Sequence, residues 1–342
     1  MNFDAKRKRL ALAATGFGLV LAGSKFIQRR GMNLQGQVVA ITGGSRGLGL
    51  AIAEEFAHQG ARLVLCARDE EELNQAQQHL AQLGAKALTI PCDITDRQQA
   101  QRLVQQATEH FGRIDILINN AGIISLGPLQ TTTRRDFEEA MNVIFWGTYN
   151  MTEAVLPQML QRHSGHITNI TSIGGKVSVP HLLPYTSAKF ATVGFSEGLR
   201  AELAKEGIVV TTIVPGLMRT GSPINIIVKG AKHREEYAAF KLLDTQPYTS
   251  ISAKKAAKQI VSATRRGSAE VVLSIQAQLA ARFHGLFPGT TSDILGFINR
   301  FLPSGEDAGI QPHSGKESES PLTNSFLTEL GQKAEQRYNE AD

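Results

Sequence analysis

The sequence predicts an α/β fold in which helices cover both faces of one doubly wound parallel sheet of about seven strands. Short β-branched runs alternate along the chain with longer helical segments, which is typical of βαβ units. A glycine-rich turn follows the first of these runs and opens the first helix. With 42% hydrophobic and 20% charged residues over 342 positions, the chain has the composition of a globular protein with a large core.

The alternation extends over most of the chain. Strands are expected over 38–44, 61–68, 85–93, 113–122, 165–172, 208–216 and 269–274. Helices are expected between the first four strands, over 48–60, 69–84 and 94–112. Because parallel strands are joined by crossover helices, this order predicts a sheet that is buried on both faces.

The turn between the first strand and the first helix reads TGGSRGLG, from Thr42 to Gly49. Its glycines allow a sharp bend and a close approach to a pyrophosphate, while the helix behind it presents free N–H groups and a positive dipole end. A glycine-rich turn alone is weak evidence, because many tight turns look similar. Here the strand before it and the helix after it supply the context that a dinucleotide site requires.

A phenol and an ammonium stand four residues apart in YTSAK, at Tyr185 and Lys189. On a helix this spacing places both side chains on one face, so they are candidates for a proton-transfer pair. The same spacing recurs in YAAFK, at Tyr237 and Lys241. The spacing by itself therefore decides nothing, and the surrounding motifs must distinguish the two copies.

The turn spacing G-x-x-x-G-x-G and the later motifs resemble the single-domain form of the short-chain dehydrogenase/reductase family over residues 37–275. These motifs are NNAG at 119–122, Asn142 in MNVIFWG, Ser172 thirteen residues before Tyr185, and Pro215–Gly216 with Thr220 four residues on. The resemblance selects Tyr185 over Tyr237, and it implies a Rossmann-type oxidoreductase domain. The copy at 237–241 is then expected on an amphipathic helix of a substrate-side insertion.

Carbonyl reduction needs a hydride on carbon and a proton on oxygen, and the second must come from the protein. A free tyrosine has a pKa of about 10, and a nearby ammonium and an oxidised nicotinamide would lower it towards the working range. We therefore expect Tyr185 to be the acid or base and Lys189 to lower its pKa. Ser172 is expected to polarise the substrate carbonyl through a hydrogen bond.

The resemblance implies further roles for named residues. Lys189 would also hold the nicotinamide ribose, and Asn142 would hold a water that links Lys189 to solvent. Cofactor contacts are expected from Gly43, Ser45, Arg46, Gly47, Leu48, Gly49, Arg68, Asp93, Asn120, Ala121, Gly122, Tyr185, Lys189, Pro215, Gly216 and Thr220. No metal site is expected, and homo-oligomers would pack through the helices that contain Asn142 and Tyr185.

Two arginines favour NADP(H) over NAD(H). Arg68 stands at the end of the second strand, where an acidic residue would bind the ribose hydroxyl of NAD and an arginine accommodates the 2′-phosphate of NADP. Arg46 lies within the glycine turn, so two guanidiniums would face one phosphate. The alternative is a solvated surface in which the acidic run at 69–72 pairs with Arg68.

The basic residues concentrate in a leader over residues 1–30, which contains seven lysines and arginines and only one acidic residue, Asp4. This local charge of +6 leaves about −1 for the rest of a chain whose total is +5, which argues against a nucleic-acid binder. The apolar run Leu10–Ala22 is shorter than the ~20 residues of a spanning helix. We favour a cytoplasmic enzyme whose uncleaved leader lies on or dips into a membrane; a cleaved signal peptide and a disordered extension are the alternatives.

Cys66 and Cys92 are too few for a disulfide framework or a metal cluster, and we expect both as buried side chains in a reducing compartment. Beyond the oxidoreductase domain, an apolar extension over 276–303 has three interpretations: it covers the core, contacts a partner subunit or dips into lipid. The polar tail over 304–342 is expected to be disordered up to a last helix.

These observations predict an NADP(H)-dependent oxidoreductase that transfers a hydride between nicotinamide and a carbonyl or secondary alcohol. The isoleucines and the valine at 224 and 226–228 favour an apolar, lipid-like substrate, unless they pack on the core. Alternative functions are a reductase of small or acyl-carrier-bound ketones, a dehydratase or epimerase of sugar nucleotides, and a non-catalytic NADP-binding sensor or scaffold.

Overall fold

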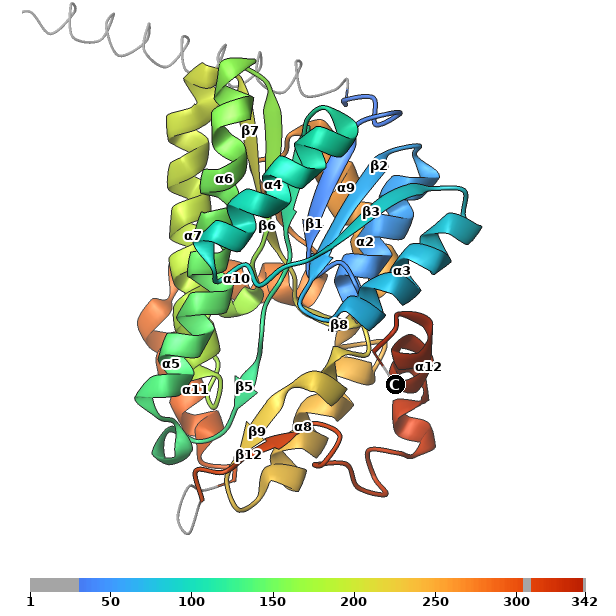
Figure 1. Cartoon of the computed structure of the whole chain (residues 1–342). Helices are drawn as coiled ribbons and strands as arrows, with labels where there is room; N and C mark the ends of the chain where they lie inside the picture. Colours follow the sequence, from blue (N-terminus) through green and yellow to red (C-terminus); the bar gives the residue numbers. More distant parts are fainter. Residues whose placement is uncertain (1–30, 304–308, 341–342) are drawn as a thin grey trace, which may run out of the picture.

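The computed structural model describes residues 31–303 and 309–340, so the leader over 1–30 lies outside the described residues. Figure 1 shows a central sheet with helices on both sides and a smaller lobe, below it in this view, that contains β8, β9, α8 and α12. The larger part carries the strands and helices predicted from the alternation, and the smaller lobe lies next to one end of the sheet.

Seven strands form the central sheet in the order β11-β7-β6-β4-β1-β2-β3, and every neighbouring pair is parallel. They are β1 (Val38–Thr42), β2 (Arg62–Ala67), β3 (Lys86–Pro91), β4 (Ile116–Asn119), β6 (Gly165–Ile170), β7 (Ile208–Val214) and β11 (Glu270–Val272). The predicted doubly wound sheet is confirmed. The chain turns to β2 and β3 on one side of β1 and then to β4 on the other, and α/β proteins bind ligands at such a switch point.

Helices cover both faces of this sheet. One face carries α2 (Gly47–His58), α3 (Glu70–Gln82) and α9 (Ala253–Arg266), and the other carries α4 (Arg97–Phe111), α6 (Gly147–Gln161) and α7 (Leu183–Leu203). The run VVAIT explains how one strand contributes to the core on both faces of the sheet, because its side chains point alternately to one face and the other. Val39 and Ile41 join the core under α2, whereas Val38 and Ala40 join the core under α4.

The smaller lobe is built from the segment that follows β7. It contains β8 (Leu217–Arg219), the 3-10 turn η5 (Ser222–Asn225), β9 (Ile227–Lys229), α8 (His233–Thr245) and β10 (Ser250–Ser252). Strand β9 lies between β5 (Ser125–Leu126) and β12 (Pro312–Ser314) in a three-stranded sheet. Val228 is fully buried in this lobe, whereas Ile227 lines the cleft described below. Of the apolar residues predicted to contact the substrate, some therefore pack in the core and others line the cleft.

The expectation of a disordered tail is corrected by the structure. Residues 309–340 form β12, the 3-10 turn η6 (Phe326–Thr328) and the last helix α12 (Glu329–Arg337). Strand β12 pairs antiparallel with β9, and Lys241 on α8 lies 3.0 Å from a Glu319 oxygen and 3.1 Å from a Glu335 oxygen. Charged pairs hold this segment, and a composition with few apolar residues therefore concealed its order.

The second Tyr–Lys copy is a buried anchor rather than a helix surface. Tyr237 and Lys241 lie on α8, and both side chains are fully buried. The Lys241 ammonium holds carboxylates of the tail, and its Nζ lies 5.6 Å from the centre of the Tyr237 ring. The spacing that suggested chemistry at 237–241 therefore serves to dock the C-terminal segment.

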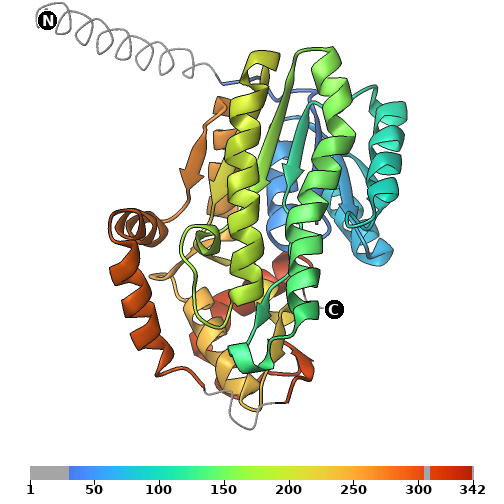
Figure 2. The same ribbon diagram turned by 90° about the vertical axis from the view of Figure 1, so that its left-hand side faces the viewer.

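The apolar extension forms two helices, α10 (Ile275–Leu286) and α11 (Pro288–Asn299). They follow β11 in the chain and lie along one flank of the molecule (Figure 2). Its large apolar side chains are exposed, namely Ile275, Leu279, Phe283, Leu286, Phe287, Ile294, Phe297, Ile298 and Phe301. Of the three interpretations, covering the core is the one that these side chains contradict. Within the described residues, none of the helices combines the length and apolar character that crossing a bilayer requires.

Candidate active site

A cavity of about 1000 Å³ opens at the carboxyl ends of β1, β2, β4 and β6. The predicted site residues that line it are Gly43, Ser45, Arg46, Leu48, Gly49, Arg68, Asp93, Asn120, Ala121, Gly122, Asn142, Tyr185, Lys189 and Thr220. The other predicted residues, Gly47, Ser172, Pro215 and Gly216, belong to the same loops but are not part of its wall. The topology thus brings one end of the sheet, the glycine turn and the Tyr–Lys helix together around one space.

The glycine turn fits the phosphates of a dinucleotide. Gly43 and Gly47 have φ values of 61° and 54°, which only glycine adopts readily. A Cβ on Gly49 would overlap the carbonyl oxygen of Gly43 and lie 2.8 Å from the amide nitrogen of Asn120. Helix α2 starts directly behind this turn without a side-chain cap, so its first-turn N–H groups are suited to an anionic ligand.

Replacing Gly49 by alanine should weaken the binding of NADPH and of NADH about five- to hundredfold. The added Cβ forces the turn to move, and such overpacking costs about 1–3 kcal/mol, of which ~1.4 kcal/mol corresponds to tenfold. Titration calorimetry measures both dissociation constants. Gly198→Ala on α7 is the matched control, because a Cβ there meets open space. Unchanged affinity in Gly49→Ala would contradict the assignment of this turn to phosphate.

The NNAG segment locks the ends of two strands together. The Asn120 side-chain amide donates to the carbonyl oxygens of Thr42 and Gly43 at 3.0 and 3.1 Å. In return, the Thr42 hydroxyl oxygen accepts from the backbone N–H groups of Asn120 and Ala121 at 2.9 and 3.0 Å. These four bonds fix the glycine turn relative to β4 and so set the width of the cleft.

Behind the cleft, a row of buried polar side chains links the sheet to α6 and α7. The Asn119 amide donates to Thr152 Oγ1 at 3.2 Å and to Asn169 Oδ1 at 2.9 Å. The Asn169 amide donates to Ser196 Oγ at 2.9 Å, and Ser196 shares a 2.7 Å hydrogen bond with Thr212 Oγ1. Because Ser196 lies on α7, the row holds the helix of the predicted catalytic pair against β4, β6 and β7.

The predicted catalytic side chains meet at the start of α7. Lys189 is 4% exposed; its Nζ donates to the carbonyl oxygen of Ile170 at 3.0 Å and lies 5.7 Å from the centre of the Tyr185 ring. Ser172 lies close enough to Tyr185 to affect its pKa, and the Ser172 Oγ accepts from the N–H of Gly174 at 3.0 Å. Burial lowers the pKa of Lys189 to about 8.

The predicted lowering of the Tyr185 pKa involves both Lys189 and an oxidised nicotinamide, and it stays a prediction. Burial raises the pKa of Tyr185 above its ordinary value, and Ser172 opposes this only in part. The lysine ammonium is itself desolvated and engaged by a carbonyl, so it does not reverse the effect of burial. At neutral pH the phenol is therefore protonated, which is the form that donates a proton.

Asn142 lies in a π-helical segment, Met141–Trp146, between α5 (Arg134–Ala140) and α6. Its side chain is exposed and lines the cleft. π-Helical segments are rare and are frequent at functional sites, because the wider turn redirects side chains. Sequence reasoning places this residue on a helix but gives no signal for the π geometry.

The two arginines differ in their surroundings. The Arg46 guanidinium pairs with Glu72 at 2.7 Å, and Ser45 Oγ donates to the same carboxylate at 2.7 Å. Arg68 also lines the cleft, and within the described part of the chain its guanidinium makes no ion pair. The acidic run after β2 thus pairs with Arg46 and not with Arg68, contrary to the alternative in which this run pairs with Arg68.

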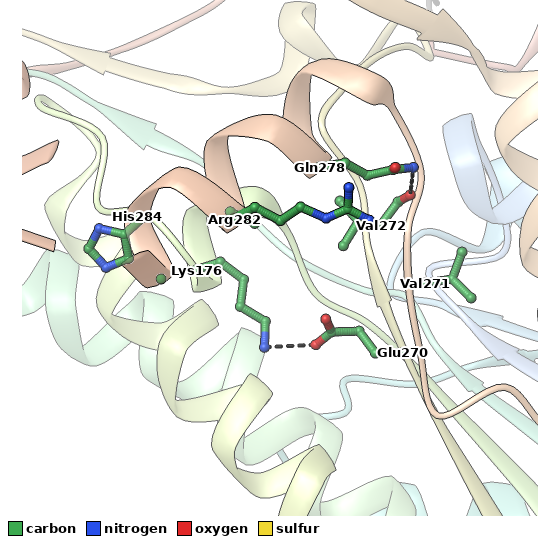
Figure 3. A pocket seen from close by; sticks show the side chains of 9 residues that line it. Lys176, Glu270, Val271, Val272, Gln278, Arg282 and His284 are labelled. Atoms are coloured by element: carbon green, nitrogen blue, oxygen red, sulfur yellow. Dashed lines mark hydrogen bonds and ion pairs between the residues drawn. The ribbon is translucent and has the colours of Figure 1, made fainter. Parts of the chain in front are cut away.

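A second, shallower depression lies between β11 and α10 (Figure 3). One of its cations already has partners, since Lys176 Nζ lies 2.7 Å from Glu270 and 2.6 Å from Glu197. None of the described residues that line it is a predicted site residue. The chemistry that the sequence predicts belongs to the large cleft.

Comparisons with known proteins agree with this geometry. A family profile described as short chain dehydrogenase matches residues 37–227. The "Dehydrogenase/reductase SDR family protein 7-like" of Anopheles gambiae is 35% identical over 80% of this chain and 86% of its own length. The "Putative oxidoreductase SadH" of Mycobacterium tuberculosis is 33% identical over 72% of this chain and 89% of its own.

A solved structure supports the same relationship. A short-chain dehydrogenase from Streptomyces avermitilis superposes with a TM-score of 0.66 at 27% identity, covering 79% of this chain and 99% of that one. The parallel sheet, the glycine turn and the extent of these matches lead to one conclusion. The chain belongs to the short-chain dehydrogenase/reductase family and is an oxidoreductase of the kind that uses a nicotinamide dinucleotide.

Proposed function

We propose that the protein reduces a ketone or aldehyde to an alcohol with NADPH, and that Tyr185 donates the proton. The observation that carries this proposal is the buried Tyr185–Lys189 pair, whose phenol stays protonated at neutral pH, beside the glycine turn. A protonated acid suits carbonyl reduction, whereas alcohol oxidation needs the phenolate.

The residues divide the work of the reaction as follows. When bound, the nicotinamide supplies a hydride to the carbonyl carbon. Tyr185 gives its hydroxyl proton to the carbonyl oxygen, and the Ser172 hydroxyl stabilises the charge that develops there and on the phenolate left behind. Lys189, with its pKa of about 8, is near the range in which a group returns a proton to that phenolate. Asn142 borders the same space and would hold a water on the path to solvent.

Cofactor choice rests on Arg68, so Arg68→Ala should raise the dissociation constant for NADPH about ten- to hundredfold and leave that for NADH within about twofold. The lost hydrogen bonds to the 2′-phosphate are charge-assisted, and such bonds are worth about 1.5–3 kcal/mol. Titration with both cofactors measures the effect. Arg97→Ala, which removes an exposed arginine that pairs with Glu153 on α6 and does not line the cleft, is the control. Equal losses for the two cofactors would contradict this role for Arg68.

We infer an apolar, lipid-like carbonyl substrate. The wall of the cleft includes Ile123, Ile124, Val143, Ile226 and Ile227. The oxidation of NADPH should be measured with long-chain keto lipids, steroids and retinoids, and with small and acyl-carrier-bound ketones for comparison. Turnover of short, water-soluble carbonyls alone would overturn the substrate assignment, and the absence of NADPH oxidation with every carbonyl would overturn the function.

Membrane association and assembly also belong to the proposal. The exposed apolar side chains of α10 and α11 support contact with a lipid surface, and cell fractionation with and without residues 1–30 tests the predicted leader. Exposed aromatic residues Trp146 and Tyr149 on the α6 side support a homo-oligomer packed through that face. Sedimentation of the full chain measures the assembly.

A further inference from the structure

The last described residues of the chain lie in the cleft assigned to the cofactor. After α12, which Figure 1 places beside β8, the chain continues through Tyr338, Asn339 and Glu340. The carbonyl oxygen of Tyr338 accepts from the N–H of Gly47 at 2.8 Å. The Asn339 amide donates to the carbonyl oxygens of Ser45 and Glu72, each at 3.3 Å. We call residues 338–340 the strap.

Glu340 connects the two sides of this cleft. Its Oε2 accepts from the Asn225 amide on η5 at 2.6 Å and lies 3.5 Å from Nε of Arg46 in the glycine turn. Its side chain is buried, and it lines the cavity that Tyr185 and Lys189 also line. A Cβ built on Gly47 would overlap the Glu340 carboxylate, so that carboxylate rests directly on the glycine turn.

These contacts use groups that suit a phosphate. A backbone N–H at a helix N-terminus and a guanidinium are the usual partners of phosphate oxygens, and the strap engages both at Gly47 and Arg46. A carboxylate and a pyrophosphate are both anions, so they repel each other when they approach the same turn. The strap therefore resembles a competitor for this site rather than a support for it.

We propose that the strap is autoinhibitory: the Glu340 carboxylate and the pyrophosphate of a nicotinamide dinucleotide compete for the glycine turn, and the cofactor binds only when the strap leaves. This inference rests on the proposed function, because it takes the turn as the phosphate site. The anchor at Lys241 holds α12 in place, so release requires only that residues 338–340 move. The strap thus lowers the fraction of molecules that are ready to bind.

Burial adds a dependence on pH, since it raises the pKa of Glu340 to about 7, with Arg46 and Asn225 opposing it. The charged groups that face Glu340 are Arg46 from the glycine turn, Glu72 from α3 and Glu335 from α12. Below pH 7 Glu340 is protonated in the closed strap, whereas the released side chain, with an ordinary pKa of about 4.3, stays charged. Closing the strap therefore takes up a proton, so NADPH affinity should fall as the pH falls from 8 to 6.

The test measures NADPH and NADH dissociation constants by titration calorimetry for four proteins: wild type, Glu340→Ala, a chain that ends at Arg337, and Glu329→Ala. The last is the control, because Glu329 is exposed on α12 and pairs only with Lys333 there. At pH 8, Glu340→Ala and the shortened chain should bind NADPH about tenfold more tightly than wild type, as expected if the strap is closed about nine-tenths of the time. At pH 6 the difference between Glu340→Ala and wild type should grow, because protonation of Glu340 favours the closed strap.

Hydrogen exchange gives a second readout that needs no substitution. Saturating NADPH should speed the exchange of the backbone amides of residues 338–340 in the wild-type chain, because the strap leaves the turn while α12 stays anchored. Slower or unchanged exchange there, or equal or weaker NADPH binding by Glu340→Ala and the shortened chain, overturns the strap alone. If none of the four proteins binds either cofactor, the proposed function fails with it.

Discussion

A Tyr185→Phe protein should lose about a thousandfold in kcat and still bind NADPH with wild-type affinity, because a positioned general acid contributes about 10²–10⁴-fold to proton transfer. The substitution removes only the phenolic hydroxyl. The ring keeps its half-buried position on α7, so the cleft keeps its shape. Single-turnover measurements with pre-bound NADPH separate the chemical step from binding.

The chain offers its own matched control in Tyr237→Phe. Tyr237 has the same spacing to a lysine, but its buried hydroxyl oxygen has no hydrogen-bond partner within the described residues. Removing it should leave kcat within about twofold and cost little stability, since no bond is lost. Comparable losses in the two variants would show that a tyrosine supports the fold rather than the reaction, and the assignment of Tyr185 would fail.

A Lys241→Ala protein should lose about 3–5 kcal/mol of unfolding free energy, because removing one partner of a buried ion pair leaves the other charge uncompensated. Lys241 is fully buried and holds Glu319 and Glu335 of the tail. Burial works to lower the pKa of Lys241, but its acidic and phenolic neighbours outweigh that effect and raise it, so the ammonium is charged in the folded chain. Urea unfolding measures the loss.

Lys333→Ala is the control for that measurement. Lys333 pairs with Glu329 at 2.6 Å on the exposed side of α12, where ion pairs contribute about 0–1 kcal/mol. A Lys241→Ala protein as stable as the control would mean that the tail is not docked on α8. It would also remove the anchor on which the strap depends.

The sheet and the glycine turn could be predicted because local patterns determine them. A run such as VVAIT is buried on both faces of a parallel sheet. Its apolar, β-branched composition predicts this burial without knowledge of the neighbouring strands. Gly49 is required because a Cβ at this position would clash with the carbonyl oxygen of Gly43 in the same turn. Both glycines are part of the motif, so the requirement is visible in the sequence. The spacing of Tyr185 and Lys189 likewise follows from one helical turn.

The tail and the strap could not be predicted, because their contacts join distant parts of the chain. Asn339 bonds to Ser45 across 294 positions, and nothing in the composition of either segment announces that partner. The effect of burial on the pKa of Tyr185 could not be predicted for a related reason. Desolvation depends on what the whole fold places around the ring, whereas the spacing to Lys189 is visible in the motif YTSAK.

The row from Asn119 to Thr212 has a consequence for how such a chain can diverge. The Asn119 amide donates to two neighbours, and the Asn169 amide accepts from one neighbour and donates to another, so a change at either position leaves two other groups without their partner. Single substitutions there should be harmful, whereas matched pairs that restore the pattern should be tolerated. The five positions would then evolve as one unit, and substitutions among them should show strong epistasis, because together they support the candidate active site.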